Sequence, residues 1–142
     1  MPINFYFERK ITLKNRKGLK LFIASIFEGE AKALMSLEYI FCSDEYLLNI
    51  NRLYLDHDYY TDIISFDLRD SPKSPSKGEI YISIDRVREN ADNYTVPVEQ
   101  ELHRVIFHGA LHLCGYTDKT KAQQKKMRSK EDFYLAQYEM SV

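Results

Sequence analysis

The sequence lacks any segment that would place it in a membrane. Its longest near-apolar run, residues 21–27, is far too short to cross a bilayer. Residues 1–10 mix charged and aromatic side chains and hold no apolar core of a signal peptide. We therefore expect a cytoplasmic protein that makes no membrane contact.

Cysteine is scarce, with only Cys42 and Cys114 in the chain. The two thiols could pair in principle, but disulfides are rare in cytosolic proteins. We therefore expect both cysteines to be reduced and buried.

An excess of charge of either sign is also absent. The 20 basic and 21 acidic side chains give a formal net charge of −1, which offers nucleic acid no overall attraction. The basic residues are nevertheless unevenly spread, because residues 9–20 and residues 119–130 hold six each and no acid. These stretches form either local phosphate-binding surfaces or two solvated faces, and charge alone favours the solvated faces.

The hydrophobic patterns predict one domain over residues 1–142, without an internal repeat. Strands are expected at residues 3–7, 37–42, 62–66 and 78–84, the last two pairing antiparallel across a loop at 67–77. Helices are expected around residues 19–27, after a Ser43 cap, from residue 85, from Pro97 to Gly115, and from Thr120, where Thr120 and Gln123 have capping-box spacing. The fold class is α+β, a small mixed sheet of about four strands packed against about five helices.

The segment with the clearest chemistry is residues 101–120, ELHRVIFHGALHLCGYTDKT. On a helix, His108 and His112 are four residues apart and point from the same face, as two imidazoles sharing a metal ion must. Gly115 suits the end of that helix and lets the chain reverse. Asp118 follows six residues after His112, close enough to return a third ligand.

Two other interpretations of these residues need weighing. Asp118 could be a helix cap, but Thr120 with Gln123 provides a better one and leaves Asp118 free. An HExxH zinc protease has the same histidine spacing and needs a glutamate after the first histidine as its general base. Gly109 occupies that position here and cannot accept a proton, so the protease interpretation lacks its base.

Residues 108–118, HGALHLCGYTD, resemble the HGxLHLxGYxH signature of the YbeY endoribonuclease family. Asn51 and Tyr54 resemble its LNxxYR segment, residues 61–66 its TDVLSF segment, and residues 78–80 its GDI strand start. The matches run in the family's order. The resemblance implies a zinc-dependent endoribonuclease that cleaves single-stranded RNA, chiefly at the 3′ end of small-subunit rRNA, with a role in ribosome quality control.

That resemblance implies that His108, His112 and Asp118 are both the catalytic and the metal-binding residues. It implies one Zn²⁺ per chain, although two histidines and a carboxylate also suit other divalent metals. The expected partners are single-stranded RNA, rRNA and the small ribosomal subunit.

Two positions depart from the family pattern. Asp118 stands where the family usually has a histidine. Leu55 stands where the family has an arginine thought to face the substrate phosphate, and leucine cannot stabilise a phosphodiester. Arg52, His57 and Arg69 are either its replacements or, as we expect, surface residues.

Several roles remain open at this level. Glu101 could orient a ligand or accept a proton, but a surface salt bridge is expected. Tyr116 could stack on a base, but packing is expected. The chain could instead be a metallohydrolase of another substrate, or a ribosome-associated binding factor with a structural metal. Structural zinc usually has four ligands, so the last alternative would need a fourth, such as Cys114, which we place in the core.

Overall fold

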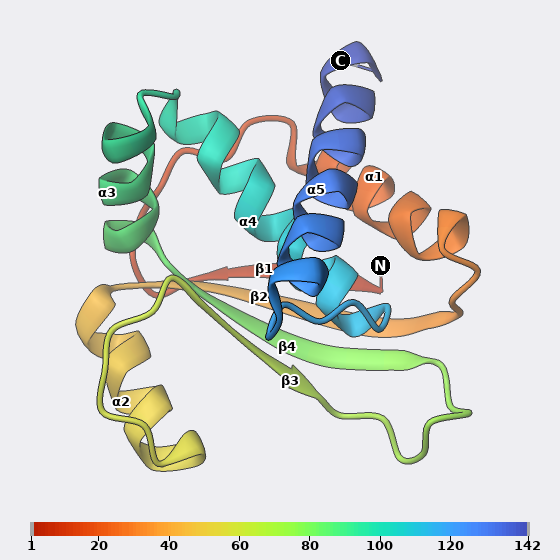
Figure 1. Ribbon diagram of the computed structural model, residues 1–142, viewed down its shortest axis with the longest axis horizontal. Helices are drawn as coiled ribbons and strands as arrows, with labels where there is room; N and C mark the ends of the chain where they lie inside the picture. The colour runs from red at the N-terminus through yellow and green to blue at the C-terminus, as the bar shows by residue number, and fades with distance from the viewer. Residues whose placement is uncertain (1, 142) are drawn as a thin grey trace.

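The computed structural model describes residues 2–141 and shows a mixed sheet packed against helices (Figure 1). The strands are β1 (Ile3–Phe7), β2 (Leu34–Cys42), β3 (Ile63–Asp67) and β4 (Ser76–Ser83). The helices are α1 (Arg16–Gly29), α2 (Asp44–Leu55), α3 (Ile84–Tyr94), α4 (Val98–Leu113) and α5 (Lys121–Ser141). The predicted α+β fold is confirmed. Within the described residues, no helix combines the length and apolarity needed to pass through a membrane.

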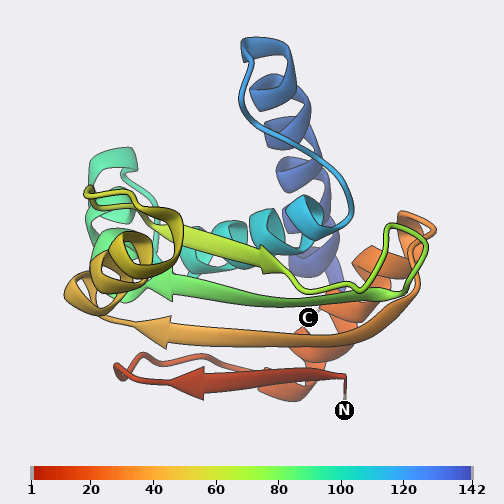
Figure 2. The same ribbon diagram turned by 90° about the horizontal axis from the view of Figure 1, so that it is seen from below.

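The sheet has the strand order β1-β2-β4-β3. β1, β2 and β4 run parallel to one another, and β3 runs antiparallel to β4, as predicted for that pair. Figure 2 shows β3 at one edge of the sheet, near α2, and β1 at the opposite edge. The helix that carries the two histidines, α4, packs against β3 and β4.

The two faces of the sheet are covered unequally. On one face, the main core joins the sheet to α1, α4 and α5 through buried residues such as Leu19, Ile106 and Leu135. On the other face, a smaller cluster around Leu47 and Ile64 attaches α2 to the sheet (Figure 1). Helix α4 is therefore held between the sheet and α5, which fixes its position over β3 and β4.

The loop predicted over residues 67–77 is too long at both ends. β3 includes Asp67, and β4 already begins at Ser76. Polar side chains do not end a strand while its backbone groups find partners. The Ser76 N–H donates to the Ala33 carbonyl at 2.7 Å, and β2 correspondingly starts at Leu34 rather than at residue 37.

Serine caps set the starts of two helices. The Ser43 hydroxyl accepts the Tyr46 N–H at 3.1 Å, which confirms the predicted cap of α2. The Ser83 hydroxyl accepts the Arg86 N–H at 3.2 Å in the same way. Ile84, predicted as the last residue of a strand, therefore opens α3 instead.

The ends of α4 and α5 follow the sequence signals. Pro97 is the N-cap of α4, and Gly115 after its C-terminus has a φ of 109°, a conformation that glycine adopts without strain. The Gln123 side chain accepts the Thr120 N–H at 3.1 Å, and the Thr120 hydroxyl accepts the Gln123 N–H at 3.1 Å. This capping box leaves the Asp118 carboxylate free of any capping role.

Both cysteines are free and buried, as expected. Burial raises the pKa of Cys42 and of Cys114 to about 12, so neither thiol is a ready nucleophile or metal ligand.

Candidate functional site

A groove of about 680 Å³ contains all three side chains that the sequence predicts as ligands. Its histidine wall, built from α4, the loop after it and α5, comprises His108, His112, Asp118, Lys119, Arg128 and Glu131. Its loop wall, built from the end of α2 and the segment before β3, comprises Leu55, His57 and Tyr59. The three predicted ligands come from two segments and line one wall of the groove.

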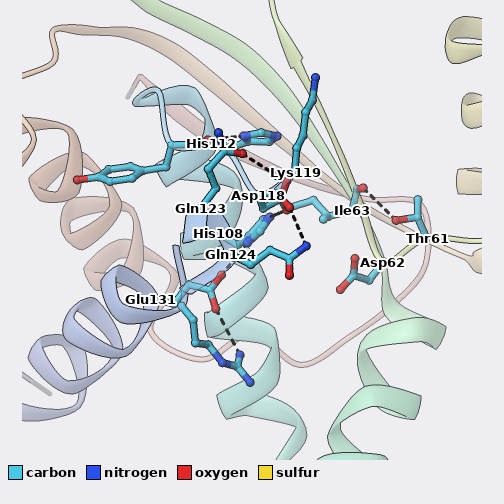
Figure 3. A network of polar contacts seen from close by, with 12 residues as sticks. Thr61, Asp62, Ile63, His108, His112, Asp118, Lys119, Gln123, Gln124 and Glu131 are labelled. Carbon is cyan, nitrogen blue, oxygen red and sulfur yellow. Dashed lines mark hydrogen bonds and ion pairs between the residues drawn. The ribbon is translucent and has the colours of Figure 1, made fainter. Parts of the chain in front are cut away.

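His108 is held between two carboxylates (Figure 3). Its Nδ1 lies 2.7 Å from Oε2 of Glu131, and its Nε2 lies 3.4 Å from Oδ2 of Asp118. An ionised carboxylate can only accept a hydrogen bond, so Nδ1 carries the proton that Glu131 accepts. In the neutral imidazole, the Nε2 lone pair therefore faces Asp118 and the groove.

His112 is oriented in the same way by the backbone. Its Nδ1 donates to the Tyr116 carbonyl at 2.7 Å, because a carbonyl oxygen can only accept. The Gly115 turn brings that carbonyl back over the end of α4. The rings of His108 and His112 are 5.9 Å apart between centroids, and both leave Nε2 available.

Glu131 is a site residue that the sequence interpretation missed. It is 5% exposed, and its Oε1 accepts from Arg104 Nη1 at 3.0 Å. Burial alone would raise the pKa of Glu131. Hydrogen bonds and positive charge from His108 and Arg104 outweigh burial, so the pKa of Glu131 is lowered overall. For His108, burial acts to lower the pKa. The negative charges of Glu131, Asp118 and Asp62 outweigh burial, so the pKa of His108 is raised overall.

The donor set can be tested against a bound cation. Two ligands at 2.0–2.1 Å from a tetrahedral zinc stand about 3.3 Å apart, close to the 3.4 Å between His108 Nε2 and Asp118 Oδ2. Each histidine also donates its Nδ1–H to a fixed acceptor, as metal-bound histidines usually do. As they stand, however, no three His, Cys, Asp or Glu side chains among residues 2–141 form a group that could hold a metal. The tautomers of both histidines and the separation of His108 Nε2 from Asp118 Oδ2 fit a cation, whereas His112 as placed does not complete a three-ligand group.

Two further carboxylates line the groove, those of Asp62 and Glu101. Burial is the first cause of the raised pKa of each. The expected surface salt bridge of Glu101 is wrong: the side chain is 5% exposed, and the described part of the chain gives it no ion pair. Its position seven residues before His108 places it on the buried side of the groove.

The position of the family arginine is part of the loop wall, because Leu55 lines the groove. Arg52 pairs with Asp58, and Arg69 pairs with Asp67 at 2.6 Å, and neither arginine lines the groove. Of the three suggested replacements, only His57 does. The cations that do line the groove are Lys119, Arg104 and Arg128, which come from α4, α5 and the loop between them.

Tyr116 and Cys114 take structural places. Tyr116 packs on the main core and donates its hydroxyl to Glu30 at 2.6 Å, as expected. Cys114 is buried in that core and does not line the groove. It therefore offers no fourth ligand to a structural metal at the histidines.

Comparison with known proteins gives a consistent result. A family model described as endoribonuclease YbeY matches residues 7–139. A Cytophaga hutchinsonii endoribonuclease YbeY is 48% identical over 134 residues, 93% of each chain. The Flavobacterium psychrophilum protein of that name is 48% identical over 130 residues, 92% of this chain and 91% of its own. A solution structure from Thermotoga maritima has a TM-score of 0.65 at 28% identity, covering 96% of this chain and 88% of that one. The resemblance drawn from the motifs is confirmed.

Proposed function

Because the chain belongs to the endoribonuclease YbeY family, we propose that it is a metal-dependent endoribonuclease of single-stranded RNA. Its substrate is rRNA, chiefly the 3′ end of the small-subunit species, and it works in the cytoplasm with the small ribosomal subunit, where it also contributes to ribosome quality control. The observation that carries the chemistry is the histidine wall, where His108 Nε2 and Asp118 Oδ2 stand 3.4 Å apart inside a groove.

The proposed metal ligands are His108, His112 and Asp118, with one Zn²⁺ per chain as the first candidate. Three protein ligands leave a fourth position open, as catalytic zinc sites do. A cation bound there would polarise a phosphoryl oxygen and help to activate a water molecule. Asp118 contributes negative charge, which offsets part of the cation's charge and suits several divalent metals.

The other residues of the histidine wall orient the ligands and the substrate. Glu131 holds His108 in one tautomer, and the Tyr116 carbonyl does the same for His112. Lys119 and Arg128 line the same wall, where their positive charges can meet phosphates on either side of the cleaved bond.

A direct assay tests the function. Metal-free protein is reloaded with Zn²⁺, Mn²⁺ or Mg²⁺ and given an unstructured RNA, the same RNA annealed to its complement, DNA of the same sequence, and a peptide pool. We expect cleavage of the unstructured RNA alone, and only after metal is restored. Cleavage of peptides, or of RNA in chelator, contradicts the proposal. In cells that lack the protein, 3′-extended small-subunit rRNA should accumulate.

A further inference from the structure

We propose that His57 and Tyr59 of the loop wall form a stacking subsite that receives one nucleobase of the RNA strand whose phosphate lies at the histidine wall. The inference rests on the proposed function and adds how the strand is gripped. The ligand class is a flat, unpaired heteroaromatic ring, bound through its face and therefore with little sequence preference.

The two rings already form a stack. Their centroids are 5.1 Å apart with an interplanar angle of 23°, and the Tyr59 hydroxyl lies 3.0 Å from His57 Nδ1. Tyr59 is nevertheless 55% exposed, so ring surface remains open to solvent. Because both side chains line the groove, an incoming base can extend the stack next to the reaction site.

The loop that carries the rings is anchored, although it is exposed. Asn51 is 1% exposed, and its side-chain amide donates to the Tyr59 carbonyl at 2.9 Å. The Asn51 carbonyl accepts the His57 N–H at 3.1 Å, and Arg52 pairs with Asp58, the residue between His57 and Tyr59 in the sequence. Residues held in place before binding lose less conformational entropy on binding, so this loop is a prepared surface.

The charges of the two walls determine which wall the bases of the strand face and which wall its phosphates face. The loop wall offers Leu55 and two rings and no lysine or arginine, whereas the cations Lys119 and Arg128 lie on the histidine wall. Bases therefore face the loop wall, and phosphates face the histidine wall. A base inside a duplex is stacked on both faces and cannot enter, so the subsite also selects single strands.

The test is an abasic scan. A short unstructured RNA is made as a series, each member lacking one base, and its Kd for the metal-free protein is measured by fluorescence anisotropy. In the parent protein, one position should be sensitive, with a loss of about 5- to 100-fold, as for one lost base–aromatic stack. Tyr59→Leu should weaken the complete RNA by a similar factor and abolish the sensitivity at that position.

Matched variants separate stacking from other effects. Tyr59→Phe keeps the ring and should behave like the parent. Tyr60→Leu removes the neighbouring tyrosine, which is 46% exposed, donates to Glu45 and does not line the groove, and it should change nothing. If Tyr59→Leu does not fold, 2-aminopurine placed at the sensitive position should still be quenched by the parent protein.

The contrary results are distinct. The subsite is overturned, while RNA binding itself stands, if the abasic RNA and the Tyr59→Leu variant lower affinity by factors that multiply when the two are combined. A 2-aminopurine base that is not quenched overturns it as well. Equal losses in the Tyr59 and Tyr60 variants overturn it too. A parent protein that binds no RNA at all removes the proposed function and the subsite with it.

Discussion

The two walls of the groove are held in place in different ways. On the histidine wall, His108 is fixed by Glu131, which comes from another helix 23 residues further along the chain. On the loop wall, Tyr59 is fixed by Asn51, only eight residues before it. The first arrangement depends on the packing of α4 against α5, and the second depends on one buried amide.

This difference matches what each wall has to do. A metal site tolerates small errors in ligand position poorly, so its ligands need support from rigid elements. A base-stacking surface only has to present a ring face, for which a locally anchored loop is sufficient. Damage to one wall should therefore leave the function of the other intact.

The largest effect on metal binding and RNA cleavage is expected from loss of the two histidines. His108→Ala with His112→Ala should remove the bound metal and lower RNA cleavage by about a thousandfold or more, since the cation contributes several kcal/mol. Affinity for unstructured RNA should change little, because the loop wall is intact. Elemental analysis and anisotropy test this on the same samples, and metal content equal to the parent's contradicts the site.

Next in size is the effect of Glu131→Gln. The amide oxygen can still accept from His108 Nδ1, but without the negative charge, so metal affinity should fall about 10- to 100-fold. Competition with a chromophoric chelator measures that loss. Asp132→Asn is the matched control, because Asp132 also binds Arg104, at 2.8 Å, but does not touch His108. A similar loss in both variants would mean that the arginine, and not His108, is what matters.

Asn51→Ala tests the other wall. It leaves the Tyr59 carbonyl without its buried partner and should lower the free energy of unfolding by about 1–3 kcal/mol. RNA affinity should fall as well, while metal content stays at the parent level. Chemical denaturation, anisotropy and elemental analysis together check this pattern. Loss of metal in this variant would show that the walls are not independent.

The smallest effect is expected from the solvated face of α5. Lys121, Lys125 and Arg128 share that face, but only Arg128 lines the groove. Replacing all three with glutamine should reduce the slope of log K against log salt by about 0.7, the value for one phosphate contact to a single strand. A reduction near 2 would mean that the whole face binds RNA. Lys32, Lys73 and Lys77, which do not line the groove, are the charge-matched control.

The sequence predicted most of the helices and strands because their signals are local, and the proposed ligand trio rests on local signals too. Helical spacing places His108 and His112 on one face, and the capping box at Thr120 frees Asp118. Glu131 was missed because glutamate on a lysine-rich helix usually faces solvent. A signal was present, since Glu131 falls in the spacing of the buried stripe of α5. That stripe comprises Met127, Glu131, Tyr134, Leu135 and Tyr138.

The loop wall could not be predicted in the same way. Nothing in the spacing of His57 and Tyr59 shows that they stack or face a groove, because that depends on how α2 and β3 meet α4. Glu101 was misjudged for a related reason. Its charge suggested the surface, whereas the packing of α4 buries it at 5% exposure.

The most direct test of the central claim is the metal content of Asp118→Ala. Asp118 is one of the two departures from the family pattern, and its side chain is 42% exposed, so its removal should cost little stability. We predict a folded protein that loses bound metal and RNA cleavage together, with Asp118→Asn intermediate in metal affinity. A variant that binds as much metal as the parent, whether or not its Tm falls, would show that Asp118 is not a ligand and would contradict the site proposed here.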